Sequence, residues 1–500
     1  MIGLLVAAVA TWSAIALLRS AAHGNAALEF DAIKTGLTVG VGIGGLAALL
    51  LTARKQWLNE LTHRHNERVA RHSQHDADER RVTELYIKAV EQLGGEKAVV
   101  RLGGLYGLER LAQNHLQHRQ TIVNVICTYL RMPHHNGTTR AAEEESDTDS
   151  SASGQPAQDE EREVRLAAQT LLRNHLLNNN GTSPSEQFWD NVSIDLKGAM
   201  LENFSLQDCS VGSIDLSNAR FIGSAIFSGA RFKYELKLTG ATFTDTADFD
   251  STRVEGSIRL NEAKFCGRLS FQDAKLTEAS FEQSEFIEGA SFYRTIFEGP
   301  VNFKKVTASA SCSFGETKFT DEALFESADF REGAWFTDAE FEDNAQFDSS
   351  QFGETAFFTG TTFRQYTTFR AVSFTGGFWC ENVEFMSNTR FGGATFAKLS
   401  RIENVNFHSH AHLDYLKLNG LLTIVDTTFH SYLEMHDWIE REGGSVGFFD
   451  TYVEAAENKS LFKRKWLREW HVVPCEDKPG WGRFISRDND GGGVPEKKAE

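Results

Sequence analysis

Residues 317–349 read TKFTDEALFES ADFREGAWFTD AEFEDNAQFDS, which is an eleven-residue unit in three consecutive copies. A large apolar residue, mostly Phe, returns in these copies at alternating steps of five and six positions, and steps of five or six continue from about residue 196 to residue 429. A fixed short period over many copies is the sequence signature of a repeat architecture. The residues that we expect to form the structural core are Phe314, Phe319, Phe325, Phe330, Phe336, Phe341, Phe347, Phe352, Phe358 and Phe363.

The composition of the unit excludes a helical supercoil. An eleven-residue period can wind helices around one another, but units rich in Phe, Thr, Ser, Gly and Asp form helices poorly. A chain that buries one large residue every five or six positions must turn a corner between each pair, so that four short faces close one coil. Ala323, Ala334 and Ala345 each stand two positions before a Phe and would fill the space beside its ring. The spacing therefore predicts a square β-solenoid whose coils stack at about 4.8 Å.

The spacing changes at three places. Leu276, Phe281 and Phe286 are separated by two consecutive five-residue steps, whereas Ala308 and Cys380 put a small residue where a large one is expected. A missing residue shortens one side of a coil, and a missing ring leaves space in a closely packed interior. We therefore expect a kink or a slimmer coil at these positions.

Two segments at the start of the repeats, LKGAML (196–201) and LSNARF (216–221), keep a strict five-residue step. They resemble the A(D/N)Lxx motif of the pentapeptide-repeat family, in its membrane-anchored, actinobacterial form. The resemblance implies an all-β fold, a right-handed quadrilateral β-helix, over residues 191–429. With two eleven-residue units in each coil, residues 196–429 give about eleven coils. The resemblance also implies a transmembrane helical hairpin and a small helical module before the β-helix. The extra residue in alternate repeats departs from the motif and is expected to widen two of the four corners.

The N-terminal residues indicate a membrane anchor. Residues 1–18 and 35–53 are uncharged and apolar, and about 20 such residues are enough to cross a bilayer. We interpret residues 1–53 as two transmembrane helices joined by a short loop. Lys and Arg are frequent directly after the second stretch, so the positive-inside rule places both termini in the cytoplasm. The sequence therefore predicts a multi-pass protein of the inner (plasma) membrane, with the lipid bilayer as one partner.

Three glycines recur at every fourth position of the second apolar stretch, a spacing that lets two helices approach closely. The helix that they receive is either residues 1–18 of the same chain, which also contain small residues, or the same stretch of a second chain in a homodimer. The three residues are Gly36, Gly40 and Gly44.

The remaining segments surround the repeats. Residues 54–133 show apolar residues at helical spacing and predict a cytoplasmic helical module, and residues 161–190 predict a helix and an N-terminal cap. Residues 134–160 are acidic, rich in Ser and poor in apolar residues, so we expect a disordered linker. Residues 430–500 leave the repeat spacing and are expected to be a C-terminal cap, which covers the open strand edges, and a polar tail. The basic segment LFKRKWLREW (461–470) either belongs to this cap or touches the membrane surface.

No motif in the chain indicates catalysis or a cofactor. The patterns GxxxxGK[ST] and HExxH are absent, and no nucleophile–base pair stands out. The six Cys contain no CxxC pair, and we expect no disulfides, no cofactor and no metal ion. Two groups of His suggest a metal site, but neither has a matched set of carboxylates or Cys, so we interpret them as solvated surface residues. The groups are His408, His410 and His412, and His63, His65, His72 and His75.

The distribution of acidic residues suggests a second hypothesis for the function. The chain has a formal net charge of −18, and eleven carboxylates lie between residues 321 and 354, where Arg331 is the only basic residue. On a regular rod they would form a band of negative potential. We interpret the chain first as a non-catalytic, membrane-tethered scaffold that presents its solenoid to an unidentified protein and does not bind nucleic acid directly. The alternative, which the family resemblance implies, is an acidic rod that imitates DNA and binds a topoisomerase such as DNA gyrase. The acidic band comprises Asp321, Glu322, Glu326, Asp329, Glu332, Asp338, Glu340, Glu342, Asp343, Asp348 and Glu354.

Overall fold

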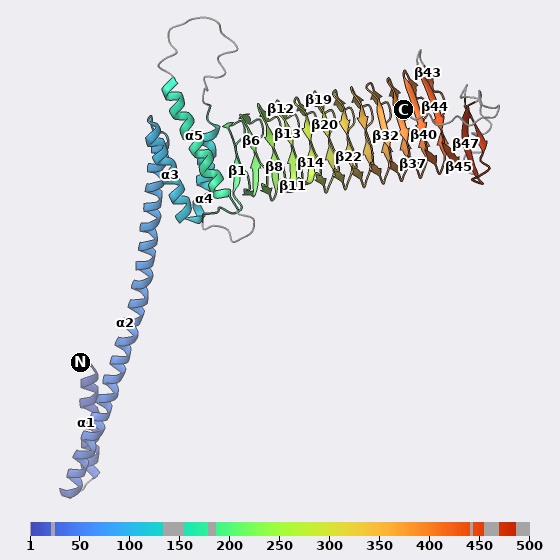
Figure 1. The fold of residues 1–500 in the computed structure, drawn as a ribbon. Helices are drawn as coiled ribbons and strands as arrows, with labels where there is room; N and C mark the ends of the chain where they lie inside the picture. The colour runs from blue at the N-terminus through green and yellow to red at the C-terminus, as the bar shows by residue number, and fades with distance from the viewer. Residues whose placement is uncertain are drawn as a thin grey trace. The chain divides into compact units, whose positions relative to one another are not determined.

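Two compact units make up the structure, a computed structural model that describes residues 2–21, 26–133, 155–178, 187–440, 444–454 and 470–486 (Figure 1). The first unit is Met1–Ile87, and the second is Lys88–Glu500. The first unit is helical. The second contains a group of helices followed by a long β-solenoid.

In the first unit, α1 (Ile2–Ala21) packs against α2 (Ala26–Leu93). A Cβ atom at Gly36 would overlap the side chain of Ile15, and one at Gly40 would overlap Thr11. These two glycines therefore receive α1 of the same chain, which is one of the two arrangements that the sequence left open. The homodimer stays a prediction.

The helices of this unit differ from the predicted pair of spans. Among the residues that the structure describes, one helix is long and apolar enough to cross a membrane, and it is the part of α2 from Glu29 to Leu93. Ala8–Ala21 is also an apolar helix, but it is shorter. Residues 26–34, which the prediction places in the loop between the two spans, are helical instead. α2 begins at Ala26 because AALEFDAIK (26–34) consists mainly of good helix formers. Gly44 lies half-buried on α2.

Three α-helices and a 3₁₀ turn follow in the second unit: α3 (Ala98–Asn114), η1 (Leu116–His118), α4 (Arg119–Arg131) and α5 (Gln155–Leu176). Their interior is apolar and includes the buried side chains of Leu108, Ile126 and Leu172. The acidic linker expected over residues 134–160 ends earlier than predicted, because α5 already begins at Gln155; residues 134–154 lie outside the described part of the chain. Pro156 fits this start, since the first turn of a helix needs no N–H donor there.

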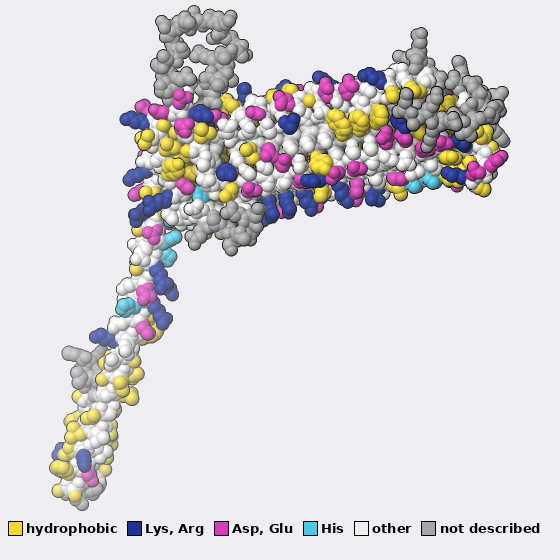
Figure 2. Space-filling model, viewed as in Figure 1, with side chains coloured by type: hydrophobic (Ala, Val, Ile, Leu, Met, Phe, Trp, Pro, Cys, Tyr) yellow, Lys and Arg dark blue, Asp and Glu magenta, His cyan; other side chains and the backbone are white. Residues whose placement is uncertain are grey.

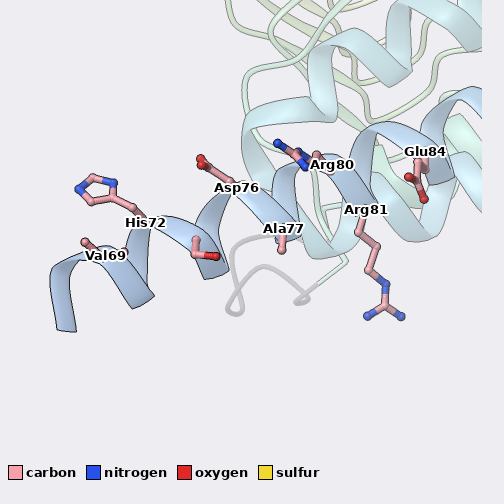
Figure 3. Close-up of a pocket in the computed structure, with 8 residues that line it drawn as sticks. Val69, His72, Asp76, Ala77, Arg80, Arg81 and Glu84 are labelled. Carbon is pink, nitrogen blue, oxygen red and sulfur yellow. The ribbon is translucent and has the colours of Figure 1, made fainter. Parts of the chain in front are cut away.

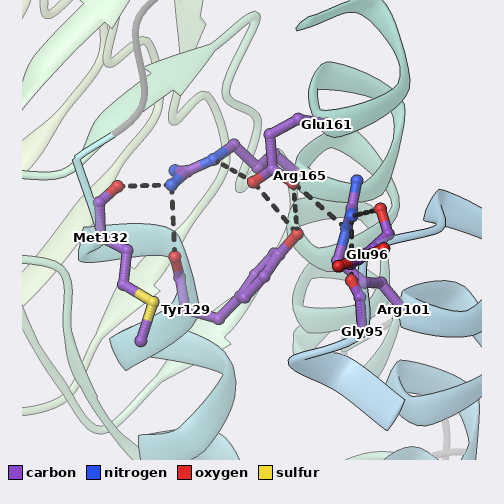
Figure 4. Close-up of polar contacts among 7 residues, drawn as sticks. All are labelled: Gly95, Glu96, Arg101, Tyr129, Met132, Glu161 and Arg165. Carbon is purple, nitrogen blue, oxygen red and sulfur yellow. Dashed lines mark hydrogen bonds and ion pairs between the residues drawn. The ribbon is translucent and has the colours of Figure 1, made fainter. Parts of the chain in front are cut away.

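Arg165 joins α5 to the end of α4 (Figure 4). Its side chain is only 6% exposed, and its guanidinium donates to the main-chain oxygens of Leu130, at 2.8 Å, and Met132. It also forms an ion pair with Glu161 at 2.9 Å, and the Tyr129 hydroxyl donates to the same carboxylate at 2.9 Å. Burial, with a smaller contribution from Glu161, raises the pKa of Tyr129. The last carbonyls of a helix lack partners within it, so Arg165 satisfies them and fixes α5 against α4.

Four faces form each coil of the solenoid, and parallel strands stack along every face (Figure 1). Face I runs from β1 (Ser193–Asp195) to β42 (Leu433–Glu434), and face II from β2 (Met200–Glu202) to β43 (Ile439–Glu440). Face III runs from β6 (Ala225–Ile226) to β44 (Ser445–Phe449), and face IV from β3 (Ser210–Val211) to β45 (Tyr452–Glu454). Face II contains 12 strands, one from each coil. The predicted square β-solenoid is confirmed, but it extends to residue 454 and not only to residue 429.

Phe side chains fill the interior in columns. All ten predicted core residues are buried. The ring of Phe336 stacks on Phe314 in the preceding coil at 4.8 Å and on Phe358 in the next coil at 4.7 Å. It also meets Phe325 and Phe347 edge to face, at 5.6 and 5.5 Å. Both arrangements are favourable for aromatic rings. Adjacent coils are therefore held together by ring stacking in the core as well as by hydrogen bonds of the backbone.

Two of the four corners are tight turns. At the corner after face III, the Thr252 N–H donates to Phe249 O at 3.1 Å, and Ser251 has a φ of 56°, as a type II turn requires. The Thr252 hydroxyl donates to Phe227 O of the preceding coil at 2.8 Å. The six-residue steps lie after faces II and IV, so the extra residue of the repeat is placed at two opposite corners.

The missing residue near Phe281 is absorbed at a single corner. Between β11 (Arg253–Arg259) and β14 (Lys275–Ser280), the pairing changes from Val254↔Leu276 to Ser257↔Glu278, so partners 22 residues apart become partners 21 residues apart. Phe281 nevertheless stacks on Phe303 at 4.7 Å. The columns of rings thus continue through the change in register.

The coil at Cys380 is not slimmer, and the expectation is corrected. Phe378 stands where the preceding coil has Ala356, while Cys380 stands in the column of Phe358, and both residues are buried. The large and the small residue have exchanged positions, which keeps the interior volume nearly constant. Ala308 is also buried, and its neighbouring small position holds the larger Val306 in place of Ala or Ser.

Both ends of the solenoid are covered. The side-chain amide of Gln120 on α4 donates to Ser193 O at 2.7 Å and accepts from the Ser193 N–H at 2.9 Å, as a neighbouring strand would. At the other end, β46 (Trp470–Pro474) and β47 (Trp481–Ser486) pair antiparallel, and β47 pairs in the same way with β45. Of the basic segment 461–470, only Trp470 lies within the described residues, and it begins β46.

Candidate docking surface on the solenoid

Three aromatic side chains form a ladder on the outside of face III. They are Trp335 on β24 (Ala334–Trp335), Phe357 on β28 (Ala356–Phe357) and Trp379 on β32 (Phe378–Glu381), and the strand register places each beside the next. The rings of Trp335 and Phe357 lie 6.0 Å apart and nearly parallel, and those of Phe357 and Trp379 lie 6.3 Å apart. All three are only half-buried, so the ladder presents aromatic surface to solvent. Figure 2 shows hydrophobic side chains gathered on this part of the solenoid.

Along the corner beside the ladder, the side chains are small in the first coils and apolar in the later ones. Gly333, Thr355 and Gly377 follow one another along the corner between faces II and III, and Leu399 and Leu421 continue the row. Gly377 has a φ of 129°, and a Cβ atom there would meet Leu399 O at 2.7 Å, so this position accepts only glycine. Leu399 and Leu421 are 52% and 40% exposed. Adjoining exposed apolar side chains of this kind are typical of interaction surfaces.

Carboxylates flank the ladder on both sides. Glu332 and Glu354 precede its rungs at one corner, and Asp338 follows Trp335 at the other. Glu381 is the last residue of β32, near Arg401, which stands beside Trp379 in the next coil. Within the described residues, Glu332 has no ion pair, and the nearest basic partner of Glu354 is Lys398 at 3.9 Å. The ladder is therefore an apolar stripe with negative edges.

The predicted acidic band is spread around the solenoid. Asp329 lies on face II and Glu340 on face IV, while the remaining nine carboxylates lie outside the strands, at the corners. Stacking also brings in basic residues from adjacent coils: Lys304 pairs with Glu326 at 2.8 Å, and Lys318 with Glu342 at 2.7 Å. Arg331 is the only basic residue between residues 321 and 354, but in the folded solenoid Lys304 and Lys318 also face the band. These charges reduce its net negative charge.

The two groups of predicted surface His behave differently. His63, His65, His72 and His75 are exposed on α2. On the solenoid, by contrast, His408 Nε2 lies 2.6 Å from a carboxylate oxygen of Glu384, and His412 Nδ1 lies 2.7 Å from one of Glu434. The prediction that the solenoid His lack carboxylate partners is therefore wrong for His408 and His412, whereas His408 and His410 are exposed, as predicted. The partners stand one coil away in the sequence, and the 22-residue coil length was the signal that could have found them.

Two hollows lie on the helices. One is formed by side chains of α2 alone (Figure 3), among them His72, Asp76 and Arg80. The other lies between α3 and α5 and includes Tyr106, Glu109 and Glu163. The first hollow includes Ser73 as well as His72, but consecutive residues of a helix do not face each other, and both side chains are exposed. The outer face of the solenoid is therefore the better candidate for function.

Comparison with known proteins gives one match. A family model described as pentapeptide repeats (9 copies) matches residues 206–253, 238–282, 260–307 and 309–351. No curated protein matches the chain, and no solved structure matches it.

Proposed function

Because the solenoid belongs to the pentapeptide-repeat family, we propose that the chain is a non-catalytic, membrane-tethered scaffold that holds another protein on face III. The observation that carries this proposal is the aromatic ladder of Trp335, Phe357 and Trp379. Aromatic side chains are enriched where proteins bind one another, because a large rigid ring gives contact area at a small cost in conformational entropy.

The chemistry of the ladder selects a partner of one kind. The main-chain groups of face III are bonded between coils, so a partner cannot add a strand to this face and must bind through side chains. The ring separations of 6.0 and 6.3 Å are close to the roughly 5–6 Å between side chains one turn apart on a helix. The acidic residues at the edges of the ladder favour a partner with positive charge beside its apolar stripe. The proposed occupant is an amphipathic helix of a partner protein, with an apolar stripe bordered by Lys and Arg.

A defined peptide tests the docking surface. A helical peptide with a Leu stripe and Lys borders should bind the full-length protein in detergent and quench its Trp fluorescence, and binding should weaken with salt because screening shortens the reach of the acidic edges. Replacing Trp335 and Trp379 with Ser should abolish binding. The matched control replaces two exposed aromatic residues away from the ladder, Tyr234 and Tyr415, with Ser. Equal binding by the ladder variant and the control, or by a peptide with Glu borders, would refute the proposed surface.

The membrane tether has its own support and its own test. The apolar part of α2 is long enough to cross a bilayer, and RKQWLNELTHRHNERVARH (54–72) follows it with many Lys and Arg. The proposal includes both spans, cytoplasmic termini and the inner (plasma) membrane. Carbonate washing should leave the protein with membranes, and a Cys placed at residue 25, but not one at residue 150, should react with an impermeant reagent outside intact cells. A mature chain that starts after residue 21 would refute the first span and the cytoplasmic N-terminus, and release of the protein by the carbonate wash would refute the tether.

A further inference from the structure

Four polar side chains meet on two adjacent coils of face I, near the C-terminal end of the solenoid. His412 on β38 (Ala411–His412) lies beside Glu434 on β42, with Nδ1 and Oε2 2.7 Å apart. Two residues past the end of each strand are Asp414 and His436, and the Tyr415 N–H donates to His436 O at 2.9 Å, which keeps the two segments side by side. His436 Nε2 is 2.8 Å from the other oxygen of Glu434. Two imidazoles and two carboxylates thus alternate in a square.

Three of the four side chains have ligand atoms close enough for one ion. One atom from each of His412, Asp414 and Glu434 lies within 4.8 Å of the other two, and all three side chains are half-buried. Ligands of a tetrahedral ion with bonds of about 2.0–2.2 Å are roughly 3.2–3.6 Å apart. A small opening of the two hydrogen bonds to Glu434, with loss of the protons that they hold, would give this spacing.

No side chain at Gly392 of the preceding coil covers this group of four residues. Gly392 has no side chain, and a Cβ atom there would lie 3.4 Å from both carboxylate oxygens of Asp414. Arg390 precedes His412 in the same column, but its guanidinium lies over the ring of Tyr366, 5.6 Å from the ring centre. Among the described residues, no Lys or Arg forms an ion pair with either carboxylate of the square. Its negative charge is therefore balanced only by the imidazoles.

We propose that His412, Asp414, Glu434 and His436 bind one divalent transition-metal ion of the Zn²⁺ type. Imidazole nitrogen with carboxylate oxygen suits Zn²⁺ and its neighbours, whereas Ca²⁺ and Mg²⁺ prefer sites made of oxygen alone. β38 is paired with strands of the coils on both sides, and β42, the last strand of face I, is paired with β38, so His412 and Glu434 are held in place before the ion arrives. The ion would clip two coils together and stiffen the end of the solenoid.

Metal titration of the full-length protein tests the site. The protein is purified in detergent, stripped with a chelator and titrated with Zn²⁺ against a colorimetric chelator, and Co²⁺ is then added to record its visible spectrum. We expect one ion per chain. The double substitution His412→Ala with His436→Ala should remove that ion and the Co²⁺ bands. Glu434→Gln should weaken binding by more than the roughly 10–100-fold that loss of an outer-shell partner costs.

Two control variants separate the site from other His. His408→Ala with His430→Ala changes a stacked His pair on face IV, and His63, His65, His72 and His75 of α2 are replaced together in the other. Both controls should keep the ion, with circular dichroism unchanged in all variants. The proposal is overturned if the unchanged protein binds no Zn²⁺ at micromolar concentration, or if the ion is lost with either control and kept by His412→Ala with His436→Ala.

Discussion

Replacing Phe336 with Ala should destabilise the solenoid more than any change at its surface. The ring is fully buried and has two stacked and two edge-to-face partners at 4.7–5.6 Å. Phe→Ala changes in protein cores cost about 3–5 kcal/mol, because apolar contact is lost and a cavity remains. Aromatic pairs add about 0.5–1.5 kcal/mol each. We therefore expect a loss near 5 kcal/mol, at the upper end of that range.

The assay is urea unfolding of the full-length protein in detergent, followed by circular dichroism. Thr337→Ala is the matched control, since Thr337 is the next residue but lies half-exposed on the outside, and surface changes of this kind usually stay within about 0.5 kcal/mol. In a solenoid each coil contacts only its neighbours, so Phe336→Ala should lower the midpoint of the coils around it. Equal midpoints for Phe336→Ala and Thr337→Ala would refute the assignment of the inside and outside positions.

Three further predictions concern the exchanged pair, the thiols and the acidic band. Phe378→Ala and Cys380→Phe should each destabilise, by roughly 3–5 and 1–3 kcal/mol, while the two together should restore most of the loss, because the double variant recreates the pattern of the preceding coil; additive losses in urea unfolding would contradict the exchange. A thiol reagent should label half-exposed Cys266 and Cys475 in the native protein and buried Cys312 only after unfolding, because burial raises the pKa of Cys312 to about 12 and hides its sulfur; fast labelling of all six would contradict the packing. If the acidic band imitates DNA, the solenoid should inhibit gyrase supercoiling at low salt, and neutral substitutes should remove that effect without unfolding the protein; no inhibition by the unchanged protein at any salt would end that alternative. The carboxylates to replace with Gln or Asn are Glu332, Asp338, Glu342 and Asp343.

The architecture could be predicted because it depends on single positions in the repeat. A Phe at alternating five- and six-residue steps must face inward, whatever its neighbours are, and the ten predicted core residues are all buried. The end of the solenoid was placed too early, because the last coil is longer: Phe429 pairs with Val453, 24 residues on. Where the corners are longer, the apolar residues no longer recur at five- or six-residue steps, and the last coil is not recognised from that spacing.

The surface could not be predicted in the same way, because it depends on pairs of residues one coil apart. Lys318 and Glu342, or His412 and Glu434, are distant in the sequence and adjacent in space. The ladder belongs to this class as well, since Trp335, Phe357 and Trp379 are separated by 22 residues each. Once the coil length is known, such columns can be read from the sequence, which makes the period the key to the surface as well as to the core.

The corners of the solenoid have a consequence for how its gene can change. Coils in this one molecule pair residues 20, 21, 22 and 24 positions apart, as in Ile194↔Ile214, Phe265↔Phe286, Phe319↔Phe341 and Phe429↔Val453. The strands keep their columns throughout, because only the corners lengthen or shorten. An in-frame insertion or deletion of one or two codons at a corner therefore leaves the core intact, and duplication of a whole coil adds another rung to every column. The gene can lengthen the rod, or vary its corners, without having to invent a new core.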